Sequence, residues 1–371
     1  MKIAMLGHKR IPSREGGVEI VVAELSTRLV QLGHRVTCYN RGGHHVSGAE
    51  FDEGAKNVYQ GVRLKTVPTV DKKGLAAVTS SFFASLCAAF SNADVVHIHA
   101  EGPAFMCWLP KLMGKKVIVT VHGLDWQREK WKGGFGARYI HAGEKMAVRF
   151  ADRIIVLSRN VQTYFQKTYG RETVYISNGV TRPELVPADL IREKWNLEKD
   201  AYILFLGRLV PEKGIHYLLE AFRNLKTEKK LVIAGGVSDS GDYAQKLKEL
   251  AARDERVIFT GFVQGQALAE LCSNAYVYVQ PSDVEGMPLT LLEAMSYGNC
   301  CLTSDIPECT EVTEDHALTF RRGDVLDLEA QIQQLCDNPE LVCQFKTQSR
   351  TFICEKYNWD HVTHQTLELY K

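Results

Sequence analysis

The feature that most constrains this fold is an alternation of short β-rich runs with amphipathic helical stretches. In the first half we expect strands at 2–6, 35–39, 95–99, 117–122, 154–158 and 174–177, with helices such as 18–32, 137–150 and 160–169. A second series follows, with strands at 202–206, 231–234, 257–260, 276–280 and 300–303. This alternation is typical of a parallel sheet covered by helices. We therefore expect an α/β protein of two Rossmann-like, doubly wound domains that face each other across a cleft.

The expected boundary between the two series is the polar stretch 181–196, which contains Pro183 and Pro187. The chain has 371 residues, which suits two domains at roughly 150 residues each. The last thirty residues have a helical pattern with a break near Asn358. We expect domains at 1–181 and 182–356, with a final helix over 357–371.

Charge divides the chain more sharply than its formal net charge of +1 suggests. Residues 1–180 hold 25 Lys and Arg against 14 Asp and Glu, whereas residues 181–371 hold 20 against 30. A basic first half attracts an anionic acceptor or an acidic membrane surface, although mutual attraction of the halves is an equally good explanation. The most apolar stretch, 75–93, is interrupted by serines and is expected to be a packed helix rather than a membrane span.

The ten cysteines include no C-x-x-C pair, and the adjacent Cys300 and Cys301 are expected to lie in a strand. No signal peptide is expected, because Met1 leads directly into the first strand. These features favour a reduced, cytoplasmic setting, with peripheral contact at the inner face of a membrane as a further option.

The strongest local motif is the run Gly207-Arg208-Leu209-Val210-Pro211-Glu212-Lys213-Gly214, between an expected strand and an expected helix. Gly207 and Gly214 allow a tight turn and close approach of a ligand. Arg208 offers a planar fork and Lys213 a compact charge, a combination suited to a diphosphate. Taken alone, the run is equally well explained as a basic turn.

A second motif is Glu285-Gly286-Met287-Pro288-Leu289-Thr290-Leu291-Leu292-Glu293. Pro288 suits the first position of a helix, whose free N–H groups and positive dipole end favour an anion. Glu285 is expected just outside this helix and Glu293 about two turns inside it, so they reach different parts of one long ligand.

In the first half, His8-Lys9-Arg10 follows the first strand, and Gly16-Gly17 opens the first helix. Paired glycines let backbone amides approach phosphate or sugar oxygens, although a plain flexible turn is the alternative. The pattern is not G-x-G-x-x-G, which argues against a dinucleotide cofactor.

His122 is expected at the carboxyl edge of its sheet, where it can bind a sugar hydroxyl, transfer a proton or simply cap the strand. Glu101 and Asp125 are expected nearby, and Trp126 with Lys130 and Trp131 in a loop that can close over an acceptor. His97 and His99 share one strand face. They lack a third ligand at a sensible spacing, so no metal site is predicted.

Together these residues resemble the GT-B glycosyltransferases, specifically family 4, which is retaining and depends on nucleotide sugars. The resemblance runs through nearly the whole chain and includes the 151–158 segment and Asn178-Gly179-Val180. The opening Arg10-Ile11-Pro12 is similar to a subgroup that includes bacterial rhamnosyltransferases. The run His8-Lys9-Arg10 is unusual there, which leaves the sugar open.

The resemblance implies an acceptor domain at 1–181, a donor domain at 182–356 and a last helix that packs back on the first domain. It implies that Arg208 and Lys213 hold the donor diphosphate and that Glu293 binds the ribose. Glu285 and the amides of 286–289 would contact the transferred sugar and phosphate, Gly16 and Gly17 the donor phosphates or acceptor, and His122 the sugar. Arg10, Glu101, Asp125 and Trp126 are the residues expected on the acceptor side.

The expected reaction is retaining transfer of a sugar to a hydroxyl of a saccharide or lipid-linked saccharide, probed most simply by diphosphate release. No cofactor, metal or nucleic-acid partner is expected. One alternative is a sugar-nucleotide epimerase, which would need no acceptor. Two others are a non-catalytic nucleotide-sugar-binding protein and a phosphorylase that responds to inorganic phosphate.

Overall fold

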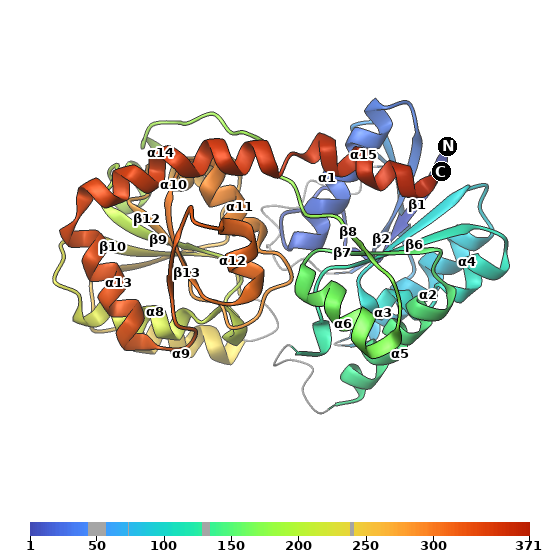
Figure 1. Cartoon of the computed structure of the whole chain (residues 1–371), viewed down its shortest axis with the longest axis horizontal. Coiled ribbons are helices and arrows are strands. Elements are labelled where there is room, and N and C mark those ends of the chain that lie inside the picture. Colours follow the sequence, from blue (N-terminus) through green and yellow to red (C-terminus); the bar gives the residue numbers. More distant parts are fainter. Residues whose placement is uncertain (44–56, 73, 128–133, 238–240) are drawn as a thin grey trace. The chain divides into compact units, whose positions relative to one another are not determined.

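Two separate parallel sheets organise the computed structural model (Figure 1), which describes residues 1–43, 57–72, 74–127, 134–237 and 241–371. Unit 1 comprises Met1–Asn178 and Trp359–Lys371, and unit 2 comprises Gly179–Asn358. The sequence predicts the corresponding boundaries at 181/182 and 356/357, two to three residues away. The chain passes between the units twice, at positions that adjoin one another, because Val180 pairs with Asn358 and its N–H donates to the Tyr357 carbonyl.

The sheet of unit 1 has the strand order β3-β4-β2-β1-β5-β6-β7-β8, parallel except for the β3–β4 hairpin. Its central strands β1, β5 and β6 are almost wholly buried, as a sheet covered on both faces requires. Their bounds are β1 Lys2–Leu6, β2 Arg35–Arg41, β3 Val58–Tyr59, β4 Val62–Val67, β5 Val95–His99, β6 Lys116–Val121, β7 Arg153–Val156 and β8 Val174–Tyr175.

The strands β3 and β4 are absent from the sequence prediction. β4 exposes Arg63, Lys65 and Thr66 and buries only Val62, Leu64 and Val67. An apolar-run criterion misses such a half-exposed strand near a sheet edge.

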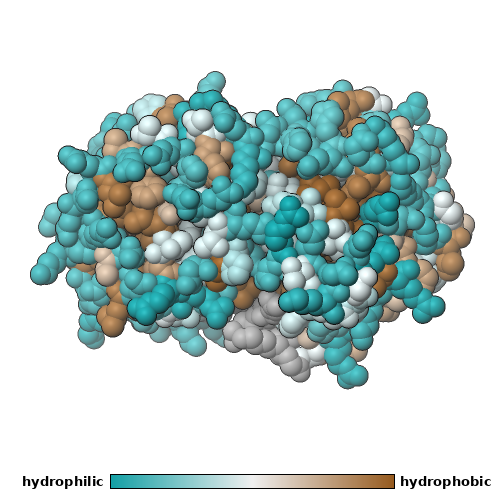
Figure 2. Space-filling view, in the orientation of Figure 1, coloured by the Kyte–Doolittle hydropathy of each residue, from teal (hydrophilic) through white to brown (hydrophobic). Residues whose placement is uncertain are grey.

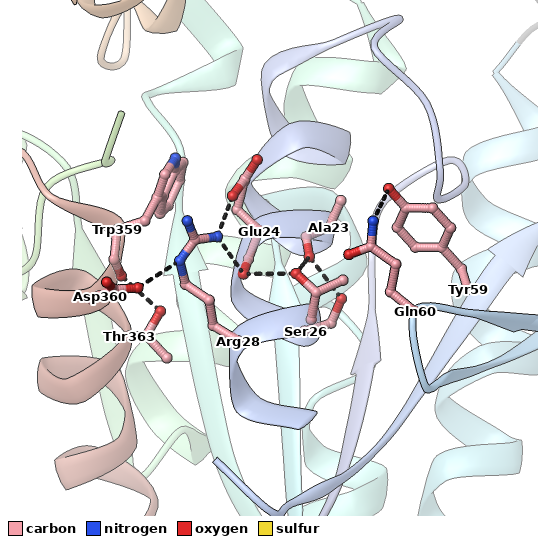
Figure 3. A network of polar contacts seen from close by, with 10 residues as sticks. Ala23, Glu24, Ser26, Arg28, Tyr59, Gln60, Trp359, Asp360 and Thr363 are labelled. Atoms are coloured by element: carbon pink, nitrogen blue, oxygen red, sulfur yellow. Dashed lines mark hydrogen bonds and ion pairs between the residues drawn. The ribbon is translucent and has the colours of Figure 1, made fainter. Parts of the chain in front are cut away.

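Helices cover unit 1, with α1 and α15 packed against each other (Figure 1). Figure 3 shows how Arg28 of α1 donates to Asp360 of α15, with Nε and Oδ1 2.9 Å apart, while it also pairs with Glu24. The last helix, which was expected to pack back on the first domain, is α15 and belongs to unit 1. The helices are α1 Gly17–Gln31, α2 Leu75–Ala89, α3 Glu101–Ala104, α4 Trp108–Leu112, η2 Asp125–Gln127, α5 Phe135–Phe150, α6 Arg159–Tyr169 and α15 Trp359–Tyr370.

The sheet of unit 2 is wholly parallel, in the order β11-β10-β9-β12-β13-β14. Its core is apolar and continuous from Ile203 and Phe205 of β9 to Leu328 and Ile332 of a covering helix. The strands are β9 Tyr202–Leu206, β10 Lys230–Ala234, β11 Val257–Gly261, β12 Val277–Gln280, β13 Cys300–Ser304 and β14 Leu318–Phe320. Cys300 and Cys301 lie in a strand, as predicted, as buried free thiols.

Helices α8, α9 and α13 pack together on unit 2, and α11 packs on α14 (Figure 1). The predicted linker is partly wrong, because α7 lies within it and Glu270 accepts the N–H groups of Asp189 and Ile191. Burial of Ile191 gives this short helix its own place in the core. The helices are α7 Leu190–Trp195, η4 Pro211–Lys213, α8 Ile215–Asn224, α9 Gly241–Ala251, α10 Gly265–Asn274, α11 Leu289–Ser296, α12 Pro307–Thr313, α13 Val325–Asp337 and α14 Pro339–Lys356.

Across the part of the chain that the structure describes, no helix combines the length and the hydropathy needed to cross a bilayer. Figure 2 shows a mostly hydrophilic face with small apolar patches. The stretch expected as a packed helix at 75–93 forms α2, which ends at Ala89.

Candidate functional site

The loop Gly207–Gly214, here called the Arg/Lys loop, follows the carboxyl end of β9 and contains the short helix η4. Gly214 ends it at φ +65°, a left-handed conformation that favours glycine. A Cβ at Gly214 would lie 1.9 Å from the carbonyl oxygen of Pro281, which follows β12. The absence of a side chain therefore lets this loop pack directly on the loop after the neighbouring strand.

That close approach brings Lys213 to Glu285, although 72 residues separate them. Lys213 Nζ lies 2.5 Å from Glu285 Oε1, and both side chains are mostly buried. A shielded ion pair of this kind is held more firmly than a surface pair, because solvent screens it less. The two strongest motifs of the sequence are thus parts of one site in unit 2.

Three residues that sequence analysis missed hold Glu285 in place. Gln280 Nε2 and Ser282 Oγ each lie 2.6 Å from Glu285 Oε1, and both residues are fully buried. The Gln280 side-chain oxygen in turn accepts a hydrogen bond from the buried Tyr278 hydroxyl. The available signal was the polar Gln280 at the carboxyl end of an otherwise apolar strand.

The start of α11 differs from the prediction at two points. Pro288 caps the helix with extended backbone (φ −75°, ψ 97°) instead of occupying its first position, and Leu289 begins the helix. Glu293 lies little more than one turn from this start, not two as expected, because it comes only four residues after Leu289. Gly286, Met287 and Leu289 are buried around this start.

Arg208 is half-buried next to Gly207, at the same edge of the sheet. Backbone bonds fix the segment, since Gly207 N donates to Ala234 O and Leu209 N to Gly236 O at 3.0 and 3.2 Å. Arg208, Lys213, Glu285 and Glu293 therefore all follow the carboxyl ends of β9 and β12, where open parallel sheets bind ligands.

In unit 1, Gly16 is the extended N-cap of α1 and Gly17 its first residue, exposed to solvent. The buried carboxylate of Glu19 reaches back to accept the N–H of Lys9, with Oε1 and N 2.8 Å apart. Glu19 thus joins the glycine turn to the loop after β1.

The loop after β1 is held by Asn40, which sequence analysis did not single out. The Asn40 side chain accepts from His8 Nε2 and from the Ile11 N–H, and donates to the Ile11 carbonyl. Burial lowers the pKa of His8 to about 4. Arg10 is half-buried and donates to the Gly43 carbonyl at 3.3 Å.

Glu101, which was expected on the acceptor side, is fully buried. It therefore acts on that side through the loop that it holds and not by direct contact with an acceptor. Its Oε2 accepts the backbone N–H of Asp125 at 2.9 Å, which holds the loop that carries Asp125 and Trp126. Burial, followed by the nearby Asp125 and Glu144, raises the pKa of Glu101 well above its usual value. Trp126 stacks on His141, with ring centroids 4.9 Å apart, whereas Lys130 and Trp131 lie outside the described residues.

His122 follows β6, as predicted, and forms a cluster with His97 and His99 of β5. His99 Nδ1 lies 3.0 Å from His122 Nε2, and the His97 and His99 rings stack with centroids 4.2 Å apart. His97 contacts the Tyr370 hydroxyl and the Thr120 hydroxyl at 2.6 and 2.7 Å. Within the described ranges, no group of three or more His, Cys, Asp or Glu side chains is arranged to hold a metal ion.

Comparisons with known proteins cover nearly all of the chain. A model described as Glycosyltransferase Family 4 matches residues 15–182, and a model described as Glycosyl transferases group 1 matches residues 188–352. The α-maltose-1-phosphate synthase of Mycolicibacterium smegmatis is 24% identical, over 100% of this chain and 99% of the relative.

Solved structures share the fold. Sucrose-phosphate synthase from Thermosynechococcus elongatus gives a TM-score of 0.85 at 22% identity, over 100% of this chain and 98% of its own. Anabaena Alr3699/HepE, solved in complex with UDP-glucose, gives 0.81 at 18% identity, over 99% and 98%. The likeness extends over both units of the chain.

Proposed function

We propose, from the premise that this chain belongs to the family 4 glycosyltransferases of the GT-B fold, that it transfers a sugar from a nucleotide diphosphate sugar to an acceptor hydroxyl with retention of configuration. The observation that carries the proposal is the joining of the Arg/Lys loop to the segment before α11 through Lys213 and Glu285. The acceptor is a saccharide or lipid-linked saccharide of cell-surface polysaccharide synthesis.

Each residue of the unit 2 site has a role in this reaction. Departure of the nucleoside diphosphate builds negative charge, which Arg208, Lys213 and the free N–H groups before α11 stabilise electrostatically. Glu293 binds the ribose hydroxyls, and Glu285 contacts the transferred sugar. A leaving phosphate oxygen takes the proton of the acceptor hydroxyl on the same face of the sugar, which accounts for retention.

The charges that the leaving group needs are supplied by side chains and backbone amides, so we propose that no metal takes part. Turnover is expected to be unchanged by a chelator. A loss of turnover in the presence of a chelator that a divalent cation restores would contradict this part of the proposal.

The substitutions Arg208→Ala and Lys213→Gln test the donor site. Removal of one preorganised charge is expected to lower kcat/KM by about 10²- to 10³-fold. The measurement is acceptor-dependent release of nucleoside diphosphate, with circular dichroism to show that the fold survives. A kcat/KM near the wild-type value in both variants would contradict the proposed donor site.

Lys346 provides the matched control for Lys213. It also forms an ion pair in unit 2, with Asp200, and donates to the Ala275 carbonyl at 2.8 Å. Asp200 and Ala275 lie just before β9 and β12, at the amino edge of the sheet, away from the Arg/Lys loop. Lys346→Gln is therefore expected to keep kcat/KM near the wild-type value.

A membrane surface is the partner that we propose for unit 1. Leu75, Phe82 and Phe90 on or at the end of α2 are exposed, as are Leu112 and Met113 at the end of α4, which packs against α2. The opposite side of α2 buries small residues instead, including Ser80, Ser81 and Ser85. Exposed apolar groups of this kind mark an interaction surface.

Basic residues adjoin this apolar patch. Lys115 Nζ donates to the carbonyl of Ser91, next to Phe90, at 2.8 Å, and Lys72 is exposed just before α2. The combination of apolar and basic groups suits an anionic bilayer, because each contributes separately to peripheral binding. The excess of Lys and Arg in the first half of the chain acts in the same direction.

Vesicle co-sedimentation tests the membrane partner. Wild-type protein is expected to sediment with vesicles of phosphatidylglycerol and phosphatidylcholine, and the double variant Phe82→Ser/Phe90→Ser to remain mostly in solution. The control Leu250→Ser/Leu326→Ser removes two exposed apolar residues of unit 2 and is expected to bind like wild type. Equal binding by all three proteins would contradict this surface.

A further inference from the structure

Two glutamates lie next to each other in the interior of unit 1, Glu101 at the start of α3 and Glu144 in α5, and both are fully buried. Their helices approach closely, because a Cβ at Gly143 would lie 2.0 Å from the Glu101 carbonyl oxygen. The two carboxyl groups are within hydrogen-bond range of each other. Two buried carboxylates this close repel each other, which favours a proton on one of them.

Glu144 has the stronger set of hydrogen-bond donors. The Tyr164 and Tyr169 hydroxyls of α6 both donate to its Oε1, the first over 2.9 Å. Burial raises the pKa of Tyr164 to about 12, so this hydroxyl keeps its proton at neutral pH. Glu101 accepts the backbone N–H of Asp125 at Oε2. Because donors stabilise the charged form of a carboxyl group, the negative charge belongs on Glu144 and the proton on Glu101.

Each carboxyl group also has one buried oxygen without a hydrogen-bond partner among the described residues, Glu101 Oε1 and Glu144 Oε2. Two ionised carboxylates cannot bond to each other, because both only accept. A proton on Glu101 Oε1 changes this, since the acid then donates to Glu144 Oε2 while Glu101 Oε2 still accepts the Asp125 N–H. One proton thus gives every oxygen of the pair a partner.

The charges around the pair favour this proton. His141 Nδ1 lies 3.8 Å from Glu144 Oε1, too far for a hydrogen bond, and the His141 side chain is 40% exposed. Asp125 of η2 adds a negative charge. Helix α2, which packs on α3, carries no charged residue, and Lys111 of α4 is paired with Asp152. The strand β5, which also packs on α3, contributes two histidines that burial keeps neutral, His97 and His99.

We propose that Glu101 is a positioning residue that acts as a protonated acid: it donates a hydrogen bond to the Glu144 carboxylate, and its other oxygen holds the Asp125 N–H at the start of η2. Loss of this proton leaves two buried carboxylates side by side. Their repulsion displaces the Glu101 side chain and loosens the segment that carries Asp125 and Trp126. Only the role of this segment on the acceptor side rests on the proposed function.

Infrared spectroscopy of the full-length protein detects the proton at about pH 7, where ordinary carboxyl groups are ionised. The proposal expects the C=O stretching band of a protonated carboxylic acid, and its loss in Glu101→Gln. Glu270 is the control, because it is also buried but accepts the N–H groups of Asp189 and Ile191, and its pKa is lowered. Glu270→Gln is expected to keep the band. A wild type without the band, or an undiminished band in Glu101→Gln, overturns the proposal.

Two amide variants decide which carboxyl group holds the proton. In Glu101→Gln the amide nitrogen can donate to Glu144 Oε2 while the amide oxygen accepts the Asp125 N–H, as in the protonated acid. Glu144→Gln leaves the negative charge on Glu101, which has the weaker set of donors. Urea unfolding of unit 1 is therefore expected to have its midpoint at a higher concentration in Glu101→Gln than in Glu144→Gln. The reverse order overturns the assignment of the proton to Glu101.

Hydrogen exchange at the Asp125 amide tests the positioning role without any substrate. Burial, followed by Asp125 and Glu144, raises the pKa of Glu101 in the folded chain, so its hold on this amide is complete at low pH and is lost as the pH rises through that pKa. The protection factor of the wild-type Asp125 amide, corrected for the intrinsic rate, is expected to fall about tenfold or more from about pH 6 to about pH 9. In Glu101→Gln it is expected to stay constant. The same pH profile in both proteins overturns the positioning role, whatever the enzyme transfers.

Discussion

Gly214 is the residue on which the geometry of the unit 2 site most depends. It combines a left-handed backbone with contact to the Pro281 carbonyl, and it immediately follows Lys213. A side chain there must push the Arg/Lys loop away from the loop that leads to Glu285. The distance between Lys213 and Glu285 is therefore set by the absence of one methyl group.

We predict that Gly214→Ala lowers both stability and kcat/KM. The left-handed conformation alone costs an alanine about 1–2 kcal/mol, and the contact with Pro281 adds to it. Chemical denaturation gives the free energy of unfolding, and diphosphate release gives kcat/KM.

Gly170 is the matched control, because it ends α6 with φ 61° and ψ 18°, close to the 65° and 20° of Gly214, yet no atom lies within 4 Å of its Cβ position. Gly170→Ala is expected to lose stability from strain alone and to keep kcat/KM. If Gly214→Ala behaves like Gly170→Ala in both measurements, the contact with Pro281 has no role in the site.

At the scale of elements, β5 and the loop after β1 bury three histidines in neutral form. The pKa of His8 is lowered to about 4 and that of His97 to about 3, and the pKa of His99 is lowered well below its usual value, in each case mainly by burial. The unfolded chain binds protons at these positions below about pH 6.5, whereas the folded chain does not. Stability is therefore present above pH 6.5 and lost as the pH falls toward 4.

We predict that His97→Gln makes the free energy of unfolding of unit 1 less sensitive to acid. Each such histidine contributes a slope of about 1.4 kcal/mol per pH unit below its unfolded pKa, and the variant removes one of them. The slope between pH 6.5 and 4.5 is compared in a Trp195→Phe background, because the other four tryptophans belong to unit 1 and report its unfolding. Equal slopes for both proteins would contradict a neutral, buried His97.

The sequence predicts elements better than it predicts contacts between them. β1, β5, β9 and α6 lie where, or within a residue of where, the apolar patterns place them, because each has a period that local residues determine. The short α7 has no such pattern, whereas β4 alternates Val62 and Leu64 with Arg63 and Lys65, a strand period that a search for continuous apolar runs misses. α11 begins at Leu289, and Pro288 is its cap and not its first residue, because proline is tolerated at both positions.

Long-range contacts within the site are the part that local patterns do not determine. The motifs of Lys213 and Glu285 indicate that both are site residues. Their ion pair, however, depends on the adjacency of β9 and β12, which are not consecutive in the chain. Gln280, Asn40 and His99 matter through partners that lie far away in sequence. Such residues become apparent only when the fold brings those partners together.

At the scale of the whole molecule, the two units carry different chemistry. Unit 2 has the ion-paired site that we propose for the donor diphosphate, and unit 1 has the histidine cluster, the glycine turn and the basic surface that we propose for the acceptor and membrane. The family membership of the chain spans both units.

The most direct test is a panel of nucleotide sugars incubated with the enzyme, with and without a membrane extract as the source of acceptor. We predict that one donor releases its nucleoside diphosphate only when acceptor is present, and that NMR of the product shows the anomeric configuration of that donor. An altered free nucleotide sugar without acceptor, an inverted product, or tight donor binding with no turnover on any acceptor would contradict retaining transfer.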